Sequence, residues 1–103
     1  MMGAPGKLMD LCWDEIHDAQ KYALLANQYK CTNRELADLY FKLSGEEMDH
    51  MARLQAMAFR LLDQERNAGR DDDGKIQAVV EHLHCRNLDA AADVGIMQGL
   101  YRK

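Results

Sequence analysis

The chain has 103 residues, a formal net charge of −4 at pH 7 and 48% hydrophobic residues. This length suits one small domain, and the composition is that of a globular chain and not of a disordered one. The acidic balance argues against a nucleic-acid partner, because nucleic-acid binding needs a clustered basic face.

Membrane association is not expected either. No apolar run approaches the roughly 20 residues of a membrane span, and no signal-peptide pattern opens the chain. The three cysteines, Cys12, Cys31 and Cys85, are too far apart for a zinc ribbon, and their odd number does not suit a disulfide framework. The sequence therefore indicates a reducing, cytoplasmic location.

Helix-forming residues dominate, β-branched residues are scarce and the only proline lies near the N-terminus, so the sequence predicts an all-α fold. The first helix is expected over residues 7–30. A second helix is expected over residues 33–66, because Thr32 and Glu35 have the spacing of a capping box, in which each side chain accepts a hydrogen bond from a backbone N–H at the helix start. Together the two helices make a helical hairpin over residues 7–66.

Residues 67–74 are rich in turn formers and make the one clear linker. Two short helices are expected after it, around residues 75–84 and 88–101, with Asn87 as the cap of the second. We interpret this C-terminal part, residues 75–103, as a segment with a role in assembly.

Each helix of the hairpin carries a seam of residues spaced alternately four and three apart, the face that a bundle helix turns toward its neighbours. In the first helix the only charged member is Glu15, and in the second Glu47 and His50 interrupt the apolar run. The two seams are Leu8, Cys12, Glu15, Ala19, Tyr22, Ala26 and Tyr29, and Leu36, Tyr40, Leu43, Glu47, His50, Leu54, Met57 and Leu61. Because an unpaired carboxylate is costly in apolar surroundings, these three side chains need a common partner.

A metal ion would be such a partner. The i, i+3 spacing of Glu47 and His50 places both on one helical face, and carboxylates with an imidazole suit iron, manganese or zinc. A buried hydrogen-bonded network that sets the register of an oligomer is the alternative interpretation.

The set formed by Glu15 and Glu47-x-x-His50 resembles the ligand motif of the ferritin-like superfamily. In its di-iron members, one Glu from each of two helices and a Glu-x-x-His from each of the other two hold the metals. The chain is most similar, over residues 7–66, to the short encapsulated ferritins, which keep two motif helices per chain and complete the site by dimerising. In that family a tyrosine seven residues after the first glutamate lies beside the metals, and Tyr22 has this spacing.

The resemblance implies that two chains form a ferritin-like four-helix bundle around two iron ions, as a dimer or a multiple of dimers. The implied activity is ferroxidase, the oxidation of Fe(II) in iron handling or protection against oxidative stress, with Glu15, Glu47, His50 and Tyr22 as catalytic residues. An encapsulating shell protein, and hence a location within a protein nanocompartment, is also implied, although no cargo-loading peptide is evident. A non-catalytic helical oligomer or adaptor, with zinc or no metal in the seam, stays open as the alternative.

The second Glu-x-x-His of the chain, Glu81 to His84, is not expected to bind metal, since Glu81 falls roughly 150° from the apolar face of its helix at about 100° per residue. Cys12 is interpreted as a small packed thiol. Three acidic residues repeat at every fourth position and form either a solvated face or an entry path for iron: Asp10, Asp14 and Asp18.

Overall fold

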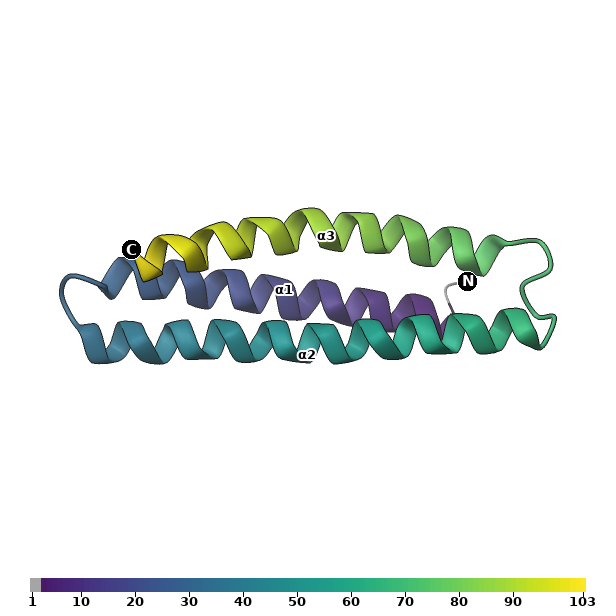
Figure 1. Ribbon diagram of the computed structural model, residues 1–103, viewed down its shortest axis with the longest axis horizontal. Helices are drawn as coiled ribbons and strands as arrows, with labels where there is room; N and C mark the ends of the chain where they lie inside the picture. Colours follow the sequence, from purple (N-terminus) through teal and green to yellow (C-terminus); the bar gives the residue numbers. More distant parts are fainter. Residues whose placement is uncertain (1–2) are drawn as a thin grey trace.

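The computed structural model of the protein describes residues 3–103 and contains three helices, α1 (Gly3–Tyr29), α2 (Arg34–Asn67) and α3 (Lys75–Arg102). Helices α1 and α2 form an antiparallel hairpin, and α3 runs back alongside it in a bundle of 56 × 20 × 17 Å (Figure 1). The described residues contain no strand, which confirms the all-α class. None of the three helices is long and apolar enough to cross a membrane.

The turn between α1 and α2 begins α2 one residue later than the capping-box prediction. The backbone N–H groups of Thr32 and Asn33 both donate to the carbonyl oxygen of Tyr29, so Thr32 belongs to the turn that ends α1. Asn33 is the cap of α2, and its Oδ1 accepts the N–H of Leu36 at 3.1 Å. The prediction of Thr32 as the cap was therefore wrong, because Asn33 stands directly before the first helical residue and accepts the N–H of Leu36, one residue beyond the N–H of Glu35 that Thr32 would have bonded.

Helix α3 is continuous, so the prediction of two short C-terminal helices was wrong. Asn87 does not cap a helix but lies in the middle of α3, with only 1% of its surface exposed. Its Nδ2 donates to the carbonyl oxygen of Met9 at 2.9 Å. Asparagine is common at helix starts because its side chain bonds nearby backbone, and here a carbonyl group of α1 takes that bond instead.

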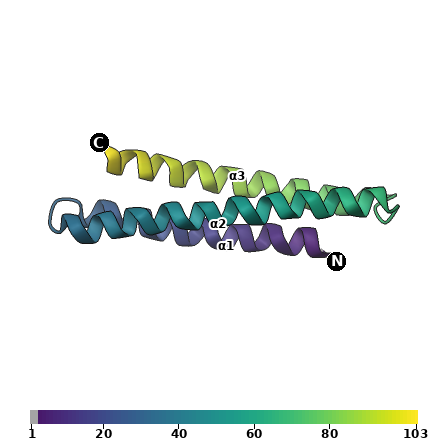
Figure 2. The same cartoon turned by 60° about the horizontal axis from the view of Figure 1, so that its bottom comes forward.

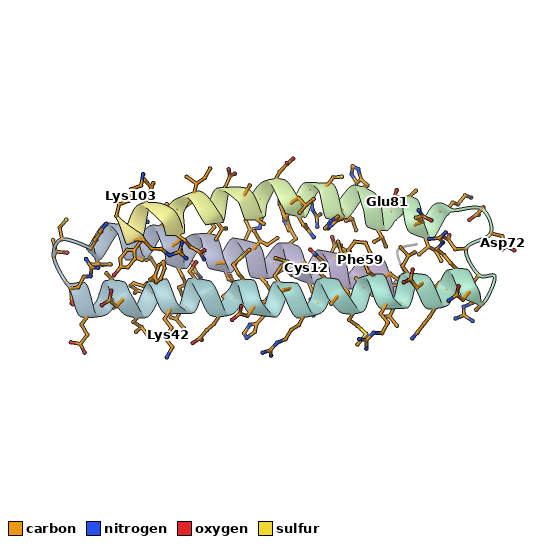
Figure 3. The ribbon with its side chains drawn as sticks, viewed as in Figure 1. Cys12, Lys42, Phe59, Asp72, Glu81 and Lys103 are labelled. Carbon is orange, nitrogen blue, oxygen red and sulfur yellow. The ribbon has the colours of Figure 1, made fainter. Side chains whose placement is uncertain are left out.

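The core is a stripe of α1 that faces both other helices. It shares Cys12, Ala19 and Ala26 with the predicted seam and is otherwise rotated away from it. Met9, Ile16 and Ala23 are fully buried, whereas the seam residues Glu15 and Tyr22 are partly exposed. The difference arises because α3 covers one side of the hairpin, and in Figure 2 it is seen as a third rod beside the α1–α2 pair. In Figure 3, the side chains of Cys12 and Phe59 lie between the helices, whereas that of Lys42 points away from α2.

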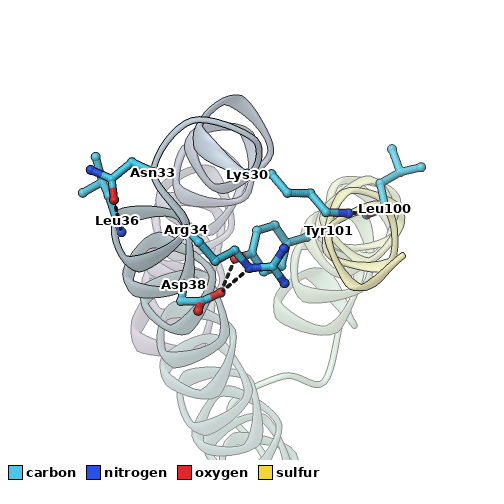
Figure 4. A network of polar contacts seen from close by, with 7 residues as sticks. All are labelled: Lys30, Asn33, Arg34, Leu36, Asp38, Leu100 and Tyr101. Atoms are coloured by element: carbon cyan, nitrogen blue, oxygen red, sulfur yellow. Dashed lines mark hydrogen bonds and ion pairs between the residues drawn. The ribbon is translucent and has the colours of Figure 1, made fainter.

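The C-terminal end of α3 is attached to the turn between α1 and α2 (Figure 4). The hydroxyl of Tyr101 donates to the carboxylate of Asp38, which also pairs with Arg34 at 3.3 Å. Lys30 Nζ donates to the carbonyl oxygen of Leu100 at 3.1 Å. Two hydrogen bonds to charged side chains, Asp38 and Lys30, therefore hold this end of α3 at the turn.

The other end of α3 is capped from the linker by Asp71. The two oxygens of its buried carboxylate accept the backbone N–H groups of Ile76, at 2.8 Å, and Gln77, at 3.0 Å. Gly74, directly before the helix, has a φ of 72°, a conformation that favours glycine. The linker therefore provides both the side-chain cap and the glycine turn with which α3 begins.

We predict that Asp71→Ala lowers the free energy of unfolding by about 1–2 kcal/mol, the usual cost of losing a helix cap. The neighbouring Asp72→Ala is the control, because Asp72 is exposed and its loss should cost less than about 0.5 kcal/mol. Urea unfolding followed by circular dichroism measures both. Equal losses in the two variants would show that Asp71 does not stabilise α3.

Candidate metal centre

The structure brings together the three residues predicted to bind metal. Glu15 comes from α1, and Glu47 and His50 from facing turns of the antiparallel α2. One ligand atom from each lies within 4.8 Å of the others. The i, i+3 spacing on α2 and the antiparallel packing of the hairpin are sufficient to produce this cluster, which confirms that the three side chains meet.

The distances within the cluster leave one oxygen without a partner. His50 Nδ1 lies 3.5 Å from Glu15 Oε2 and 3.7 Å from Glu47 Oε2. Glu15 Oε2 is nevertheless fully buried and, among the described residues, has no hydrogen-bond partner. Buried carboxylate oxygens are almost always bonded in folded proteins, so this atom requires an explanation. A metal ion bound by the three side chains would supply the missing partner, and the donor set fits one.

The electrostatics of the cluster also favour a cation. The pKa of Glu47 is raised above the ordinary value of 4.5, chiefly because a proton on its carboxyl group can be shared with Glu15. Burial and the negative charges of Glu15 and Asp18 raise this pKa further, and His50 opposes them. Two carboxyl groups facing one imidazole therefore hold more negative charge than the protein itself neutralises.

Cys12, one turn before Glu15, is not suited to be a ligand. Its Sγ donates to the carbonyl oxygen of Met51 at 3.5 Å, and burial raises the pKa of the thiol to about 11. Metal binding by cysteine requires the thiolate. The structure thus agrees with the interpretation of Cys12 as a packed thiol.

The cluster lies on the face of the hairpin that α3 leaves uncovered. Met9 and Asn27, which bond to α3, lie roughly 120° around α1 from Glu15 at about 100° per residue. Two large apolar side chains share this open face: Leu11, 48% exposed, lies one turn before Glu15, and Leu39, 51% exposed, lies about 12 Å along α2 from Glu47. One chain therefore offers three candidate ligands at an open face, fewer than the four donors that zinc takes in proteins.

Two other predictions concern residues outside the cluster. Tyr22 lies two helical turns beyond Glu15 and stacks on Tyr40, with 6.2 Å between ring centroids. Glu81 is exposed and accepts the side-chain amide of Gln77 at 2.8 Å, so it is not brought to the metal ligands. Asp18 is a residue near the cluster that the seam pattern did not include. It follows Glu15 by three residues, and its negative charge raises the pKa of Glu47.

Comparison with protein-family models, with curated proteins and with solved structures gives no match to this chain. The assignment of a function therefore depends on the chemistry of the cluster and on the fold around it.

We predict a pH dependence of stability that isolates Glu47. Because its pKa is raised in the folded chain, its protonation stabilises the fold below pH 4.5, and this contribution is lost as the pH rises through the raised pKa. The melting temperature of chelator-treated wild-type protein should therefore fall relative to that of Glu47→Gln as the pH is raised from 4.5 to neutral. Parallel melting profiles of the two proteins would contradict this.

We predict that metal binding requires Glu15, Glu47 and His50 and does not require Glu81 or His84. Alanine at any of the first three should abolish the binding of Mn(II) or Zn(II) in a calorimetric titration. Alanine at either of the last two should leave the affinity unchanged. A loss of affinity in Glu81→Ala equal to that in Glu47→Ala would exclude the cluster as the binding site.

Proposed function

We propose that the protein is a ferritin-like ferroxidase, whose substrate Fe(II) binds at a two-metal site that a second copy of the chain completes. The observation that carries this proposal is the buried, partnerless oxygen of Glu15 beside Glu47 and His50. A hydrogen-bonded network stays the alternative, because Glu47 can share a proton with Glu15 and His50 Nδ1 lies 3.5 Å from the same oxygen.

Charge balance supports two divalent ions per pair of chains. Glu15 and Glu47 give each chain two carboxylates, so a pair contributes as much negative charge as two Fe(II) ions contribute positive charge. The imidazole of His50 adds a neutral nitrogen donor from each chain. Carboxylate and imidazole ligands together suit iron, and bound iron supplies electrons to dioxygen or peroxide.

The residues of the chain have separate tasks in this proposal. Glu15 and Glu47 would hold the ions with their carboxylate charges. His50, with 49% of its side chain exposed, lies nearest to solvent in the single chain. The apolar residues around the cluster would exclude water once a second copy covers the face, which strengthens the attraction between ligands and ions.

A second copy is the occupant that best fits the open face. A two-fold axis through the cluster would bring two sets of three ligands together and would also bury Leu11, Leu39 and Met57, which are 41–51% exposed in the single chain. The four helices α1 and α2 of two chains would then form the bundle, and α3 would lie on its outer side. Enclosure of this assembly by a shell protein remains a proposal from the sequence resemblance alone.

A second candidate is a non-catalytic oligomer or adaptor that holds zinc. Zinc takes four donors in proteins, and Glu15, Glu47 and His50 provide three of them within one chain. The two candidates differ in the number of chains that the metal requires and in redox activity.

Anaerobic addition of Fe(II), followed by air, tests the proposed activity. We expect one iron per chain and an oxo-bridged ferric absorption band that Glu47→Ala abolishes. Bound iron that is not oxidised faster than free Fe(II) would exclude the ferroxidase. Elemental analysis of protein purified without chelator would then show whether zinc is present, as the second candidate requires.

We predict that the open face is needed for assembly and for metal binding. Leu39 lies about 20° from His50 around α2, whereas Leu24 lies about 180° from Glu15 around α1, on the opposite side. The two leucines are similarly exposed, at 51% and 54%. Leu39→Arg should give a monomer by light scattering and lower the metal content, while Leu24→Arg should change neither. A compact wild-type monomer that binds metal fully would contradict completion by a second copy.

A further inference from the structure

Two hydrogen bonds cross the boundary between α1 and α2, one on each side of the candidate metal cluster. On the side of the turn, the hydroxyl of Ser44 in α2 donates to the carbonyl oxygen of Ala19 in α1 at 2.7 Å. On the other side, the thiol of Cys12 in α1 donates to the carbonyl oxygen of Met51 in α2 at 3.5 Å. Both donor side chains are fully buried, so water does not compete for either bond.

The two bonds have the same spacing from the candidate ligands. In each, the donor lies three residues before the glutamate of its own helix, and the acceptor lies four residues after the glutamate of the other helix. Each bond is therefore about one helical turn from the cluster, at about 1.5 Å per residue. The bonds run in opposite directions around the two glutamates, Glu15 and Glu47: Ser44 to Ala19 and Cys12 to Met51.

These bonds can fix the axial offset of the two helices more closely than apolar packing can. Contacts between apolar side chains have little directional preference, whereas a hydrogen bond weakens steeply when its angle or length changes. Metal ligands must be held within about 0.5 Å of their working positions. Because Glu15 and Glu47 lie on different helices, the offset of α1 against α2 determines how closely their carboxylates approach.

Helix α3 reaches the same boundary through Gln98. Its Nε2 donates to Ser44 Oγ at 3.0 Å, and Ser44 in turn donates to Ala19. A hydroxyl has one proton to donate, so a donor on its oxygen leaves that proton directed at the carbonyl group of α1. No member of the cluster belongs to α3, yet two successive hydrogen bonds join α3 to the hairpin within one turn of Glu47.

We propose that Ser44 is a positioning residue for the metal ligands and that Gln98 orients it, so that the docking of α3 controls the affinity for metal. Ser44 acts by holding α1 and α2 at the offset at which the carboxylates of Glu15 and Glu47 meet His50. The inference rests on the proposed metal site, but it does not require that iron is oxidised there. Because coupling between two equilibria is reciprocal, bound metal should in turn favour the docked position of α3.

Zinc and cobalt binding to the purified protein test the role of Ser44. Ser44→Ala should weaken the binding of Zn(II) about tenfold in a calorimetric titration, the smaller end of the effect of residues that support metal ligands. At saturating Co(II), the intensity of the visible absorption bands should also change, because these bands depend on the geometry of the ligands. A variant that is merely less stable, but folded by circular dichroism, would keep the wild-type bands at saturation.

Asn87→Ala is the matched control. Asn87 is as buried as Ser44 and also donates to a carbonyl oxygen across a helix boundary, that of Met9 at 2.9 Å. Met9 lies six residues before Glu15, outside the two bonds that surround the cluster. Asn87→Ala should therefore lower the melting temperature but change the Zn(II) affinity by less than about twofold. A loss of affinity equal to that in Ser44→Ala would overturn the positioning role.

Gln98→Met tests whether α3 acts through Ser44. The substitution removes the donor and keeps a side chain of similar length. It should weaken Zn(II) binding in the wild-type background and have no further effect in Ser44→Ala, since residues of one hydrogen-bonded chain are not additive. An undiminished effect of Gln98→Met in the Ser44→Ala background would show that α3 does not act through Ser44, contrary to the proposal.

The outcomes separate this inference from the proposed ferroxidase. If Fe(II) is not oxidised but Ser44→Ala weakens Zn(II) binding and alters the Co(II) bands, the ferroxidase fails and the positioning role stands. If Fe(II) is oxidised normally and Ser44→Ala leaves both the affinity and the bands unchanged, the ferroxidase stands and the positioning role is wrong. Wild-type protein that binds neither Zn(II) nor Co(II) would overturn the positioning role as well.

Discussion

The candidate site depends on the meeting of two carboxylates and one imidazole at the boundary of two helices. Glu15 and Glu47 face each other with only His50 to offset their charges, and one oxygen of Glu15 is buried without a partner. Such an arrangement is unfavourable in an isolated chain, because like charges in a poorly solvated place repel or take up protons. The raised pKa of Glu47 is the local sign of that cost. We propose that a bound cation offsets this cost.

The fold holds the cluster in place from the opposite side. Fully buried small residues, Ala19, Ala23 and Ala26, let α1 approach its neighbours closely. Polar side chains then join the helices through backbone carbonyl groups, as when Ser44 donates to Ala19 at 2.7 Å and Asn27 donates to Met97 at 3.0 Å. Because these contacts lie away from the open face, the ligands stay partly exposed while the helices that carry them are rigidly packed.

The sequence was sufficient to predict the hairpin and the ligand cluster, because both follow from periodicity along single helices. Glu47 and His50 share a face by spacing alone, and the antiparallel hairpin brings Glu15 opposite to them. The errors arose where a side chain finds its partner across the fold. Asn87 has the local preference of a helix cap, and only the packing of α3 on α1 reveals that it bonds Met9. The stacking of Tyr40 between two rings of α1 was equally invisible, since it depends on the relative rotation of the two helices.

The location of the candidate site on only two of the three helices determines which substitutions the chain should tolerate. The three residues of the candidate metal cluster all belong to α1 or α2. Helix α3 is attached to them by inward-facing side chains, such as Asn87, Gln98 and Tyr101, and by two of its backbone carbonyl groups. Most substitutions on the outer side of α3 should therefore be neutral, while the hairpin tolerates few. Sequences descended from this one should therefore differ most in their last third and resemble one another most in α1 and α2.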